Sequence, residues 1–585
     1  MRHLRLEDGL QQLRSDRKPP SLMLMADYNA THPADPVDER QRVTDDQQVR
    51  NSDPTSQEED EPNAASRPEH RRRRTHGRDA RQHNIVPART GPGLAASGRA
   101  APGSTNRALQ HVVRQPGGRF DCFNTLPSGA DGADLVAKLV LYAHHQVYSN
   151  FFVGEVTDTS VLPYTKYALH HEHAYWGAAW FSCTSRRWLA GQSLQHTPQE
   201  LFFYTKSLES LRHALSDPAL ATHESTISTI LHLSFPPYLP HVDRSMPHPR
   251  QSNFKTWNLL HLATGLNVAE EHMLGLAAVV GMLGGVQNIQ SAQIRRSVCF
   301  QGIHFSGRHL KAPLFPFASL HPVDQLVHAS RLRRSRHAFD PASAETSRRR
   351  GTGFDDVSFP EVLPLDTRPQ PAVVWAYLAD MTTILEDYAS GGSMQSQTSV
   401  ILDQMQFTQH SLLSLAPAAD LPRPEEHEQD QRGGMATRLQ LYEITRWACI
   451  CYANLITYPT DYSTFPRLRL ARLLLHELNI LYATSMIDRL TRPEQRLVFW
   501  ATVLGAIMAV GYDDERASFV GLVARSAGDA KVRSWTEARR VMESFLWHGQ
   551  TSDPDALKLW VEVQRVARPH AAELRLPERM AGAER

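Results

Sequence analysis

The sequence predicts an all-α fold, an irregular multi-helix array that follows a long disordered N-terminal region. Three observations support this prediction. Apolar residues recur at intervals of three or four in many stretches after residue 119. Several of these stretches begin with residues that cap helices. Alternation of apolar and polar residues, which would indicate strands, is scarce, and no fixed-period repeat occurs.

Residues 1–119 are expected to form the disordered N-terminal region. From Arg14 onward this stretch is dense in Arg, Asp, Gln, Pro and Ser, apart from a short apolar patch at 22–25. Such a composition buries too little apolar surface to offset the entropy that is lost on ordering. The prediction therefore places the folded part of the chain after residue 119.

The arginine-rich segment 67–81 is the sharpest local charge feature. Its basic side chains include Arg71, Arg72, Arg73, Arg74 and Arg78. In a disordered tail these guanidinium groups would contact an acidic partner, either a nuclear-import receptor or phosphates. The alternative is a solvated charge block that no partner binds.

The rest of the chain is expected to divide into two helical halves. Residues 120–329 form the N-terminal half of a helical domain, and residues 372–570 form its C-terminal half. The polar segment 330–371 between them contains RLRRSRH and SRRR and is interpreted as an arginine-rich insertion. A flexible loop is predicted at 417–434, and residues 571–585 form a tail.

In the N-terminal half, Thr197-Pro198-Gln199-Glu200 predicts the start of a helix. A capping Thr, a Pro at the first helical position and a Glu three residues after the cap form a capping box. The apolar positions that follow predict one buried face; they are Leu201, Tyr204, Leu208, Leu211 and Leu215. An earlier stripe comprises Leu135, Val136, Leu139, Val140, Ala143 and Val147.

The stretch EEHMLGLAAVVGMLGGVQNI, residues 270–289, contains four glycines among apolar residues. A phosphate-binding Walker loop would need Lys-Ser or Lys-Thr after its last glycine, but Val286-Gln287 follow here. The glycine spacing does not fit a dinucleotide fingerprint either. We therefore expect a helix that ends at the pair Gly284-Gly285.

In the C-terminal half, Ser534-Trp535-Thr536-Glu537 predicts a capped helix start, and Gly549 is expected to end that helix. Asp553-Pro554 is then expected to open a further helix. That helix carries an apolar stripe of Leu557, Trp560 and Val561.

Histidines and cysteines invite a metal hypothesis. The run His170-His171-Glu172-His173 places His170 and His173 on one face of a turn, and His144-His145 lies upstream. Zinc needs four ligands, or three and a water, and neither a cysteine nor a second spaced histidine pair accompanies these residues. Cys449 and Cys451 are interpreted as buried apolar side chains. No metal or other cofactor is expected.

The acidic run Asp513-Asp514-Glu515 follows the longest apolar run of the chain. A magnesium-diphosphate site would need an aspartate-rich motif on a helix that faces a cavity. The run is instead interpreted as the polar start of the next helix, because Arg516 and Phe519 continue it.

Composition excludes several broad classes of protein. The 63 basic and 62 acidic residues give no global field, so a strongly basic nucleic-acid-coating protein is not indicated. The five scattered cysteines favour a reducing compartment. The longest apolar run, 498–511, is shorter than the roughly 18 residues of a spanning helix, and the N-terminus has no apolar signal region. We expect a soluble protein without membrane contact.

Several segments between about residues 120 and 566 together resemble the fungal-specific transcription factor family. YTKSLESLRHALSDPALATHESTISTILHL, residues 204–233, resembles a helix pair of that family. HMLGLAAVVGMLGGVQNI resembles its glycine-terminated helix, with Val286 in place of the usual leucine. Segments from Trp500 to Trp560 follow in the order that the family shows.

The N-terminal region adds one resembling segment and one departure. ADYNATHPADPVDERQRV, residues 26–43, resembles the family's Asn-x-Thr-His-Pro segment, but TDDQQVR replaces the basic element that normally follows. The family's binuclear zinc cluster needs six cysteines, and the first 121 residues contain none. Zinc-dependent DNA contact is therefore not expected.

The resemblance implies the regulatory half of a transcription factor. It implies a helical domain that contacts other proteins or holds a small effector, in a nuclear location shared with the cytoplasm. The implied partners are other transcription regulators or coregulators and a nuclear-import receptor.

Two alternatives belong to other classes. One is an α-helical enzyme with His170, His171 and His173, or Asp513 and Asp514, near a pocket. It is not favoured, because neither a nucleophile elbow nor a His-Glu-x-x-His motif occurs. The other is a degenerate family member that serves only as a scaffold.

Overall fold

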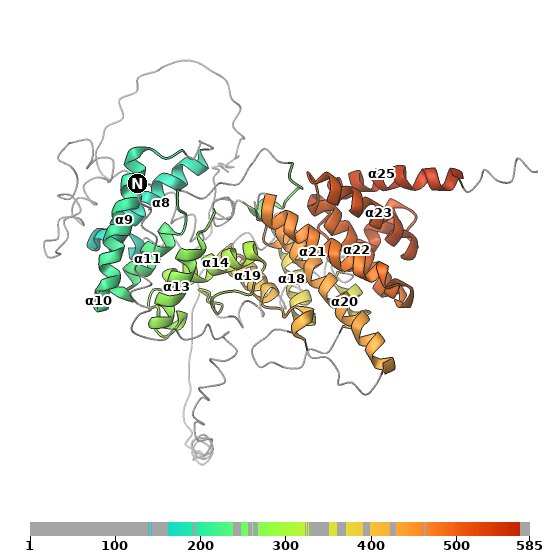
Figure 1. The fold of residues 1–585 in the computed structure, drawn as a ribbon, viewed down its shortest axis with the longest axis horizontal. Helices are drawn as coiled ribbons and strands as arrows, with labels where there is room; N and C mark the ends of the chain where they lie inside the picture. The colour runs from blue at the N-terminus through green and yellow to red at the C-terminus, as the bar shows by residue number, and fades with distance from the viewer. Residues whose placement is uncertain are drawn as a thin grey trace, which may run out of the picture. The chain divides into compact units, whose positions relative to one another are not determined.

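The computed structural model describes the parts of the chain that form helices and their connections (Figure 1). The described residues are 162–190, 195–237, 247–255, 267–321, 350–359, 370–389, 398–421, 429–460 and 464–573, with the single residues 139, 142, 260, 323 and 326. They form helices joined by turns, and no strand occurs among them. The predicted all-α class is confirmed. The predicted disordered region 1–119 lies outside the described residues.

The first group of helices builds one hydrophobic core. Its helices are α7 (Leu162–His170), α8 (Glu172–Leu189), α9 (Pro198–Ser216), α10 (Pro218–Ala221), α11 (Glu224–Leu233), α13 (Glu270–Met282), η3 (Val286–Asn288) and α14 (Ala292–His309). Helix α8 is central, because it packs against α7, α9 and α11. We call the buried apolar residues from Leu139 to Phe315 that gather around it the smaller core.

The predicted capping box of α9 is confirmed, and its Glu200 is also part of a partly buried ion pair. Glu200 N donates to Thr197 Oγ1 over 3.2 Å, and Thr197 N donates to Glu200 Oε2 over 2.8 Å. The guanidinium of Arg187 on α8 also donates to Glu200, over 2.7 Å and 2.9 Å. Glu200 therefore both caps α9 and ties it to α8.

The predicted buried face of α9 is only partly correct. Tyr204 and Leu211 are buried, but Leu201 and Leu215 are 40% and 37% exposed. Phe203, Ser207 and Ala214 are buried in addition. The buried face of α9 therefore differs from the predicted one, because it includes Phe203 and Ser207 and leaves Leu201 partly exposed.

Helix α13 ends at the predicted glycine pair. Gly284 and Gly285 have φ angles of +88° and +112°, in the region that favours glycine. Gly284 N donates to Gly281 O, and Gly285 N donates to Val280 O, each over 2.9 Å. These two bonds form a Schellman motif, which satisfies the last carbonyl groups of the helix. The prediction of a structural helix end is confirmed.

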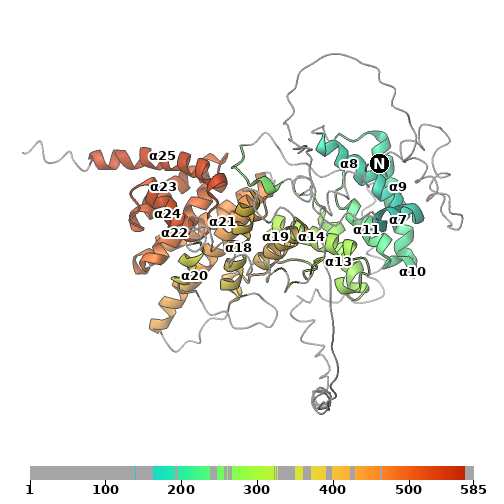
Figure 2. The ribbon, with the colours of Figure 1, turned by 180° about the vertical axis from the view of Figure 1, so that it is seen from behind.

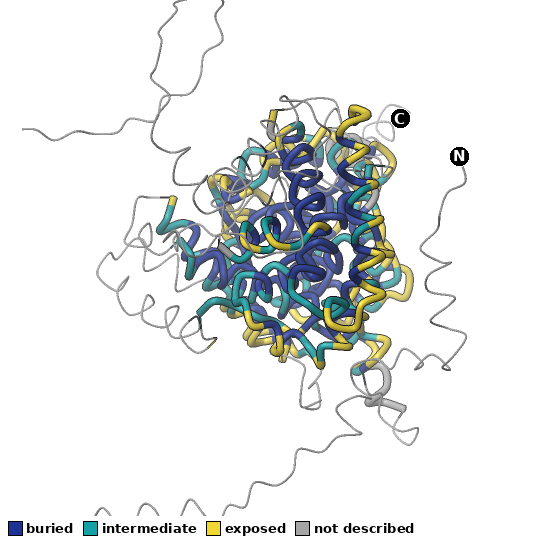
Figure 3. Tube along the Cα trace, turned by 90° about the vertical axis from the view of Figure 1, so that its left-hand side faces the viewer, coloured by how far each residue is buried: buried dark blue, intermediate teal, exposed yellow. Residues whose placement is uncertain are grey.

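The second group of helices builds a larger core. Its helices are α17 (Thr352–Asp355), α18 (Pro371–Ala389), α19 (Thr398–Leu413), η6 (Ala418–Asp420), α20 (Gln429–Tyr452), η7 (Ala453–Thr457), α21 (Thr464–Ala483), η8 (Met486–Arg489), α22 (Arg492–Met508), α23 (Asp513–Asp529), α24 (Trp535–Ser544) and α25 (Gly549–Glu573). We call the buried apolar residues from Phe254 to Val563 that they enclose the larger core. Helix α22 lies inside it and packs against α20, α21 and α23. Figure 2 shows these helices from behind, and Figure 3 shows that the buried residues of the described chain gather in the interior, with exposed residues around them.

Segments interpreted as polar connections contribute to the larger core. Within the predicted insertion 330–371, Phe354 and Val357 are buried against Trp375 and its neighbours. Helix α20 begins at Gln429, inside the predicted loop 417–434. The mostly polar composition of these segments led to their interpretation as loops. A few apolar residues, such as Phe354 and Val357, nevertheless pack into the larger core.

The predicted boundary near Gly549 is wrong. Helix α24 ends at Ser544, and Gly549 begins α25 instead of ending α24. Asp553 therefore lies inside the first turns of α25, where Trp547 Nε1 donates to its Oδ1 over 2.7 Å. Leu557 and Val561 are 47% and 42% exposed, so only Trp560 of the predicted stripe is buried.

Helix α14 contributes to both cores. Ile294, Val298 and Phe305 point into the smaller core. Cys299, Phe300 and Ile303, from the opposite side of the helix, belong to the larger core. The two cores therefore share one helix. Among the helices in the described ranges, none is long and apolar enough to span a bilayer.

Helices α22 and α23 approach closely because Gly505 has no side chain. A Cβ at this position would lie 2.3 Å from Cε1 of the buried Phe519 and 3.0 Å from Cδ2 of Leu474. We predict that Gly505→Ala lowers the free energy of unfolding by about 1–2 kcal/mol, because overpacking outweighs the gain in helix propensity. Denaturant unfolding followed by circular dichroism measures the change.

The matched control for this variant is Gly521→Ala on α23. Nothing lies within 4 Å of a Cβ added at Gly521. This substitution is expected to stabilise the protein by up to about 1 kcal/mol. Equal stability of the two alanine variants would contradict the proposed close approach.

Candidate functional site

Three histidines come together where α8 and α11 begin. His171 and His173 flank the first residue of α8, and His223 is the N-cap of α11. The ring of His171 lies 4.8 Å from that of His223 and 5.5 Å from that of His173, between centroids. His170 is exposed at the end of α7, and His144 and His145 lie outside the described residues. The sequence run drew attention to His171 and His173 but gave no signal for His223.

Ser225 joins two of these histidines. Its Oγ lies 2.9 Å from His173 Nε2 and 2.8 Å from His223 Nδ1. Ser225 N also donates to His223 Nδ1 over 3.2 Å, so that nitrogen is an acceptor and the ring is neutral. His173 then donates to the hydroxyl, and the hydroxyl donates to His223. This chain of hydrogen bonds holds the first turn of α11 against α8.

Burial keeps these imidazoles neutral. Desolvation, with smaller effects of the neighbouring histidines, lowers the pKa of His171 to about 4 and that of His173 to about 3. Desolvation also lowers the pKa of His223. At neutral pH, therefore, the cluster acts as a set of uncharged hydrogen-bonding and stacking groups.

The neighbouring carboxylate of Glu224 is occupied. Tyr167 donates its hydroxyl to Glu224 Oε2 over 2.7 Å, and Ser291 N donates to Oε1 over 2.9 Å. Ser225 itself is fully buried. A Ser–His pair used for nucleophilic catalysis needs an accessible hydroxyl and a base oriented by a third group. The hydrogen bonds of Ser225 therefore hold α11 against α8. Glu224 holds the start of α14, because it accepts from the backbone N–H of Ser291.

Within the part of the chain that the structure describes, no group of three or more His, Cys, Asp or Glu side chains, these histidines included, is arranged to hold a metal ion. The four described cysteines, Cys183, Cys299, Cys449 and Cys451, are free and buried. Burial raises the pKa of Cys449 and Cys451 well above the ordinary thiol value. The interpretation of Cys449 and Cys451 as buried apolar residues is confirmed.

The acidic run begins a helix, as the sequence indicated. Asp513, Asp514 and Glu515 form the first turn of α23, where negative charge interacts favourably with the helix dipole. Asp513 and Asp514 are exposed, and Glu515 Oε1 accepts from Arg472 Nε on α21 over 2.7 Å. Within the described residues, these carboxylates join no histidine.

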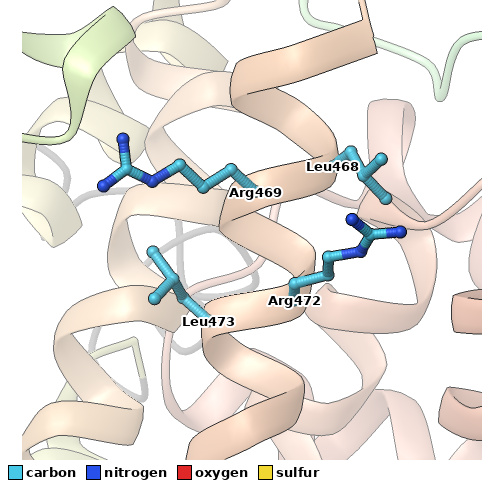
Figure 4. A pocket seen from close by; sticks show the side chains of 4 residues that line it. All are labelled: Leu468, Arg469, Arg472 and Leu473. Carbon is cyan, nitrogen blue, oxygen red and sulfur yellow. The ribbon is translucent and has the colours of Figure 1, made fainter.

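A surface pocket on α21 is lined by two leucines and two arginines that the sequence analysis missed (Figure 4). They are Leu468, Arg469, Arg472 and Leu473. Figure 4 shows the two guanidinium groups pointing away from each other. Arg472 is paired with Glu515, and Arg469 Nη1 donates to His309 O over 3.4 Å. The pocket therefore offers an apolar floor but no convergent pair of cations.

The predicted contact residues of the tail, Arg71, Arg72, Arg73, Arg74 and Arg78, lie outside the described residues. Comparison with protein-family models, with curated proteins and with solved structures gives no match to this chain. The resemblance to fungal transcription factors therefore remains a prediction that rests on the quoted segments.

The buried histidines predict that the fold loses stability in weak acid. His232 on α11 is buried, and desolvation lowers its pKa to about 3. As the pH falls below the unfolded value of about 6.5, the unfolded chain binds protons that the folded chain does not. Stability is therefore lost from about pH 6.5 downward, and His232 alone accounts for about 2 kcal/mol at pH 5.

Thermal unfolding at pH 7 and pH 5 tests this prediction. In His232→Gln the loss of Tm between the two pH values should be smaller than in the wild type. The control is His213→Gln, which replaces an exposed histidine of α9 and should leave the pH dependence unchanged. An unaltered pH dependence in His232→Gln would show that His232 does not contribute.

Proposed function

We propose that this chain is a fungal transcription-factor-like regulatory protein that lacks a zinc-cluster DNA-binding domain. It acts in the nucleus through contacts with other transcription regulators or coregulators, or through a small effector held by its helical domain. A nuclear-import receptor would bind the arginine-rich segment 67–81.

The observation that supports this proposal most directly is the folding of the resembling segments. Residues 204–233 form the end of α9, a sharp joint at Ser216-Asp217-Pro218, and α11. Asp217 Oδ1 accepts from Ala219 N over 2.9 Å and so starts the short helix α10. The second segment ends at the glycine pair after α13, which packs against α11. The two segments thus pack against each other, as parts of one domain would.

The buried state of the reactive side chains favours regulation over the alternative of an α-helical enzyme. His173, Ser225 and Cys449 are buried and bonded or packed within the protein. Stoichiometric metal in the purified protein would favour the enzyme. The third hypothesis, a scaffold without regulatory activity, predicts no transcript change when the gene is deleted.

Nuclear import gives the first test of this proposal. A fluorescent fusion of the full chain should accumulate in the nucleus, and replacing Arg71, Arg72, Arg73 and Arg74 by alanine should abolish the accumulation, because import receptors bind clustered basic side chains. The matched control removes the same charge from Arg331, Arg333, Arg334 and Arg336 and should leave accumulation intact. A wild-type fusion that stays cytoplasmic would refute the nuclear location.

Chromatin association gives the second test. The tagged full chain should be recovered with specific chromatin regions through its partners, and the signal should persist when residues 67–81 are replaced but a heterologous import signal is added. This result would place the association in the helical domain. Absence of any enriched region, together with unchanged transcripts after deletion, would support the scaffold alternative.

A further inference from the structure

One side of helix α13 is apolar and exposed. The other side of this helix packs against α11 and α14. On the exposed side, the side chain of Leu274 is 48% exposed and that of Met282 is 63% exposed. Ala278 and Gly281 are exposed between them, and Gly275 is partly exposed. We call these five residues the outer face of α13.

An apolar outer face is unusual for a helix at the surface of a protein. Such a helix normally carries polar residues on the side that meets water. Helix α24 of this chain does so, because it exposes Glu537 and Arg540 and buries Val541. Between Leu274 and Met282, by contrast, α13 has only aliphatic residues, methionine and glycine. A contiguous exposed apolar face of this kind marks a surface that binds a partner.

The two glycines of the outer face leave room for the backbone of another helix. Among the residues that the structure describes, none has an atom within 4 Å of a Cβ added at Gly275 or at Gly281. A glycine inside a helix lowers stability relative to alanine, and packing within the described chain requires glycine at neither position. A second helix that approaches closely would require it, because the distance between helix axes depends on the side chains at the contact.

The outer face is symmetric about Ala278. Gly275 and Gly281 lie three residues on either side of it, and Leu274 and Met282 lie four residues on either side. Two copies of α13 that cross antiparallel at Ala278 therefore place Leu274 of one copy opposite Met282 of the other. Each large side chain then lies beside a glycine of the other copy. A face that complements itself in this way fits a two-fold dimer, in which both copies use the same surface.

The charges of α13 favour the antiparallel direction. Its charged residues, Glu270 and Glu271, both lie in the first turn. A parallel pair would bring the carboxylates of the two copies together, and like charges repel. In the antiparallel pair, the two copies of Glu271 lie about 21 Å apart along the helix axis, which is beyond the distance over which salt screens exposed charges. The helix dipoles also oppose each other in that arrangement.

We propose that the outer face of α13 binds a second copy of this chain, in an antiparallel helix pair with its two-fold axis at Ala278. Helix α13 has 13 residues, so the pair buries less than the roughly 1,200–2,000 Å² of a standard interface. The dimer is therefore weak, with a Kd on the order of 10 µM. It does not depend on the regulatory role proposed above.

Sedimentation of the purified full chain measures the association. The chain has a mass of 65.9 kDa, and the average mass should rise toward twice this value as the concentration increases through the expected Kd. Ala278→Glu places two like charges at the axis and should weaken association at least about a hundredfold. The matched control is Ala517→Glu, which replaces an exposed alanine of α23 and should associate as the wild type does. Circular dichroism checks that both variants remain folded.

Cysteine cross-linking tests the direction and register of the pair. In the proposed dimer, position 274 of one copy faces position 282 of the other. Each position lies about 12 Å along the helix axis from the same position of the other copy, which is too far for a disulfide. Mild oxidation should therefore cross-link a mixture of Leu274→Cys and Met282→Cys chains, but neither variant alone. The wild type, oxidised in the same way, gives the background.

Three results would overturn the proposal. They are a chain that stays monomeric at every concentration, an Ala278→Glu variant that associates as the wild type does, and a mixture of cysteine variants that cross-links no more than each variant alone. The first result would leave the outer face to a partner of another kind. A chain that dimerises through α13 but associates with no chromatin keeps this interface and loses the regulatory function.

Discussion

Helix α14 must bury two opposite faces at once, and this constraint links the rest of the structure. One face supplies Ile294 and Val298 to the smaller core, and the other supplies Cys299 and Ile303 to the larger core. A helix that is buried on both sides leaves its polar side chains little access to water. Such side chains normally find a partner inside the protein. Gln301 does so by donating to Ser234 Oγ over 3.0 Å.

The polar groups inside the protein solve this problem in two ways. Around Ser225, neutral histidines exchange hydrogen bonds and remain uncharged because burial lowers their pKa values. Between α14 and α19, full charges are buried instead, and Asp403 is stabilised by backbone N–H groups while the Nη atoms of Arg296 have no partner within the described ranges. The first arrangement is complete in itself. In the second, the attraction between two buried charges takes the place of a complete set of hydrogen bonds.

Local features of the fold were predictable from the sequence, because local chemistry determines them. The capping box at Thr197 and Glu200 and the glycine pair after α13 satisfy backbone groups within a few residues, so their spacing is enough to identify them. The direction that each helix faces was harder to predict. Leu201 and Leu557 lie at helical spacing from buried residues but are exposed, because the position of the neighbouring helix decides which side is covered.

The histidine cluster and the buried ion pair depend on contacts between distant parts of the chain, which spacing does not reveal. Ser225 contacts His173, which lies 52 residues away in the sequence. Arg296 of α14 lies beside Asp403 of α19, although other helices separate α14 from α19 in the sequence. A sequence signal existed only for the histidine run. Arg296 and Asp403 look like ordinary polar positions of a helix, and only burial distinguishes them.

Hydrogen exchange measured by mass spectrometry on Ile303→Ala tests the shared helix most directly. Ile303 lies in the larger core, and its truncation should cost about 2–5 kcal/mol. If α14 couples the two cores, exchange should accelerate in α8 and α11 as well as in α22. Faster exchange confined to α22 and its neighbours, with α8 and α11 protected as in the wild type, would contradict the account.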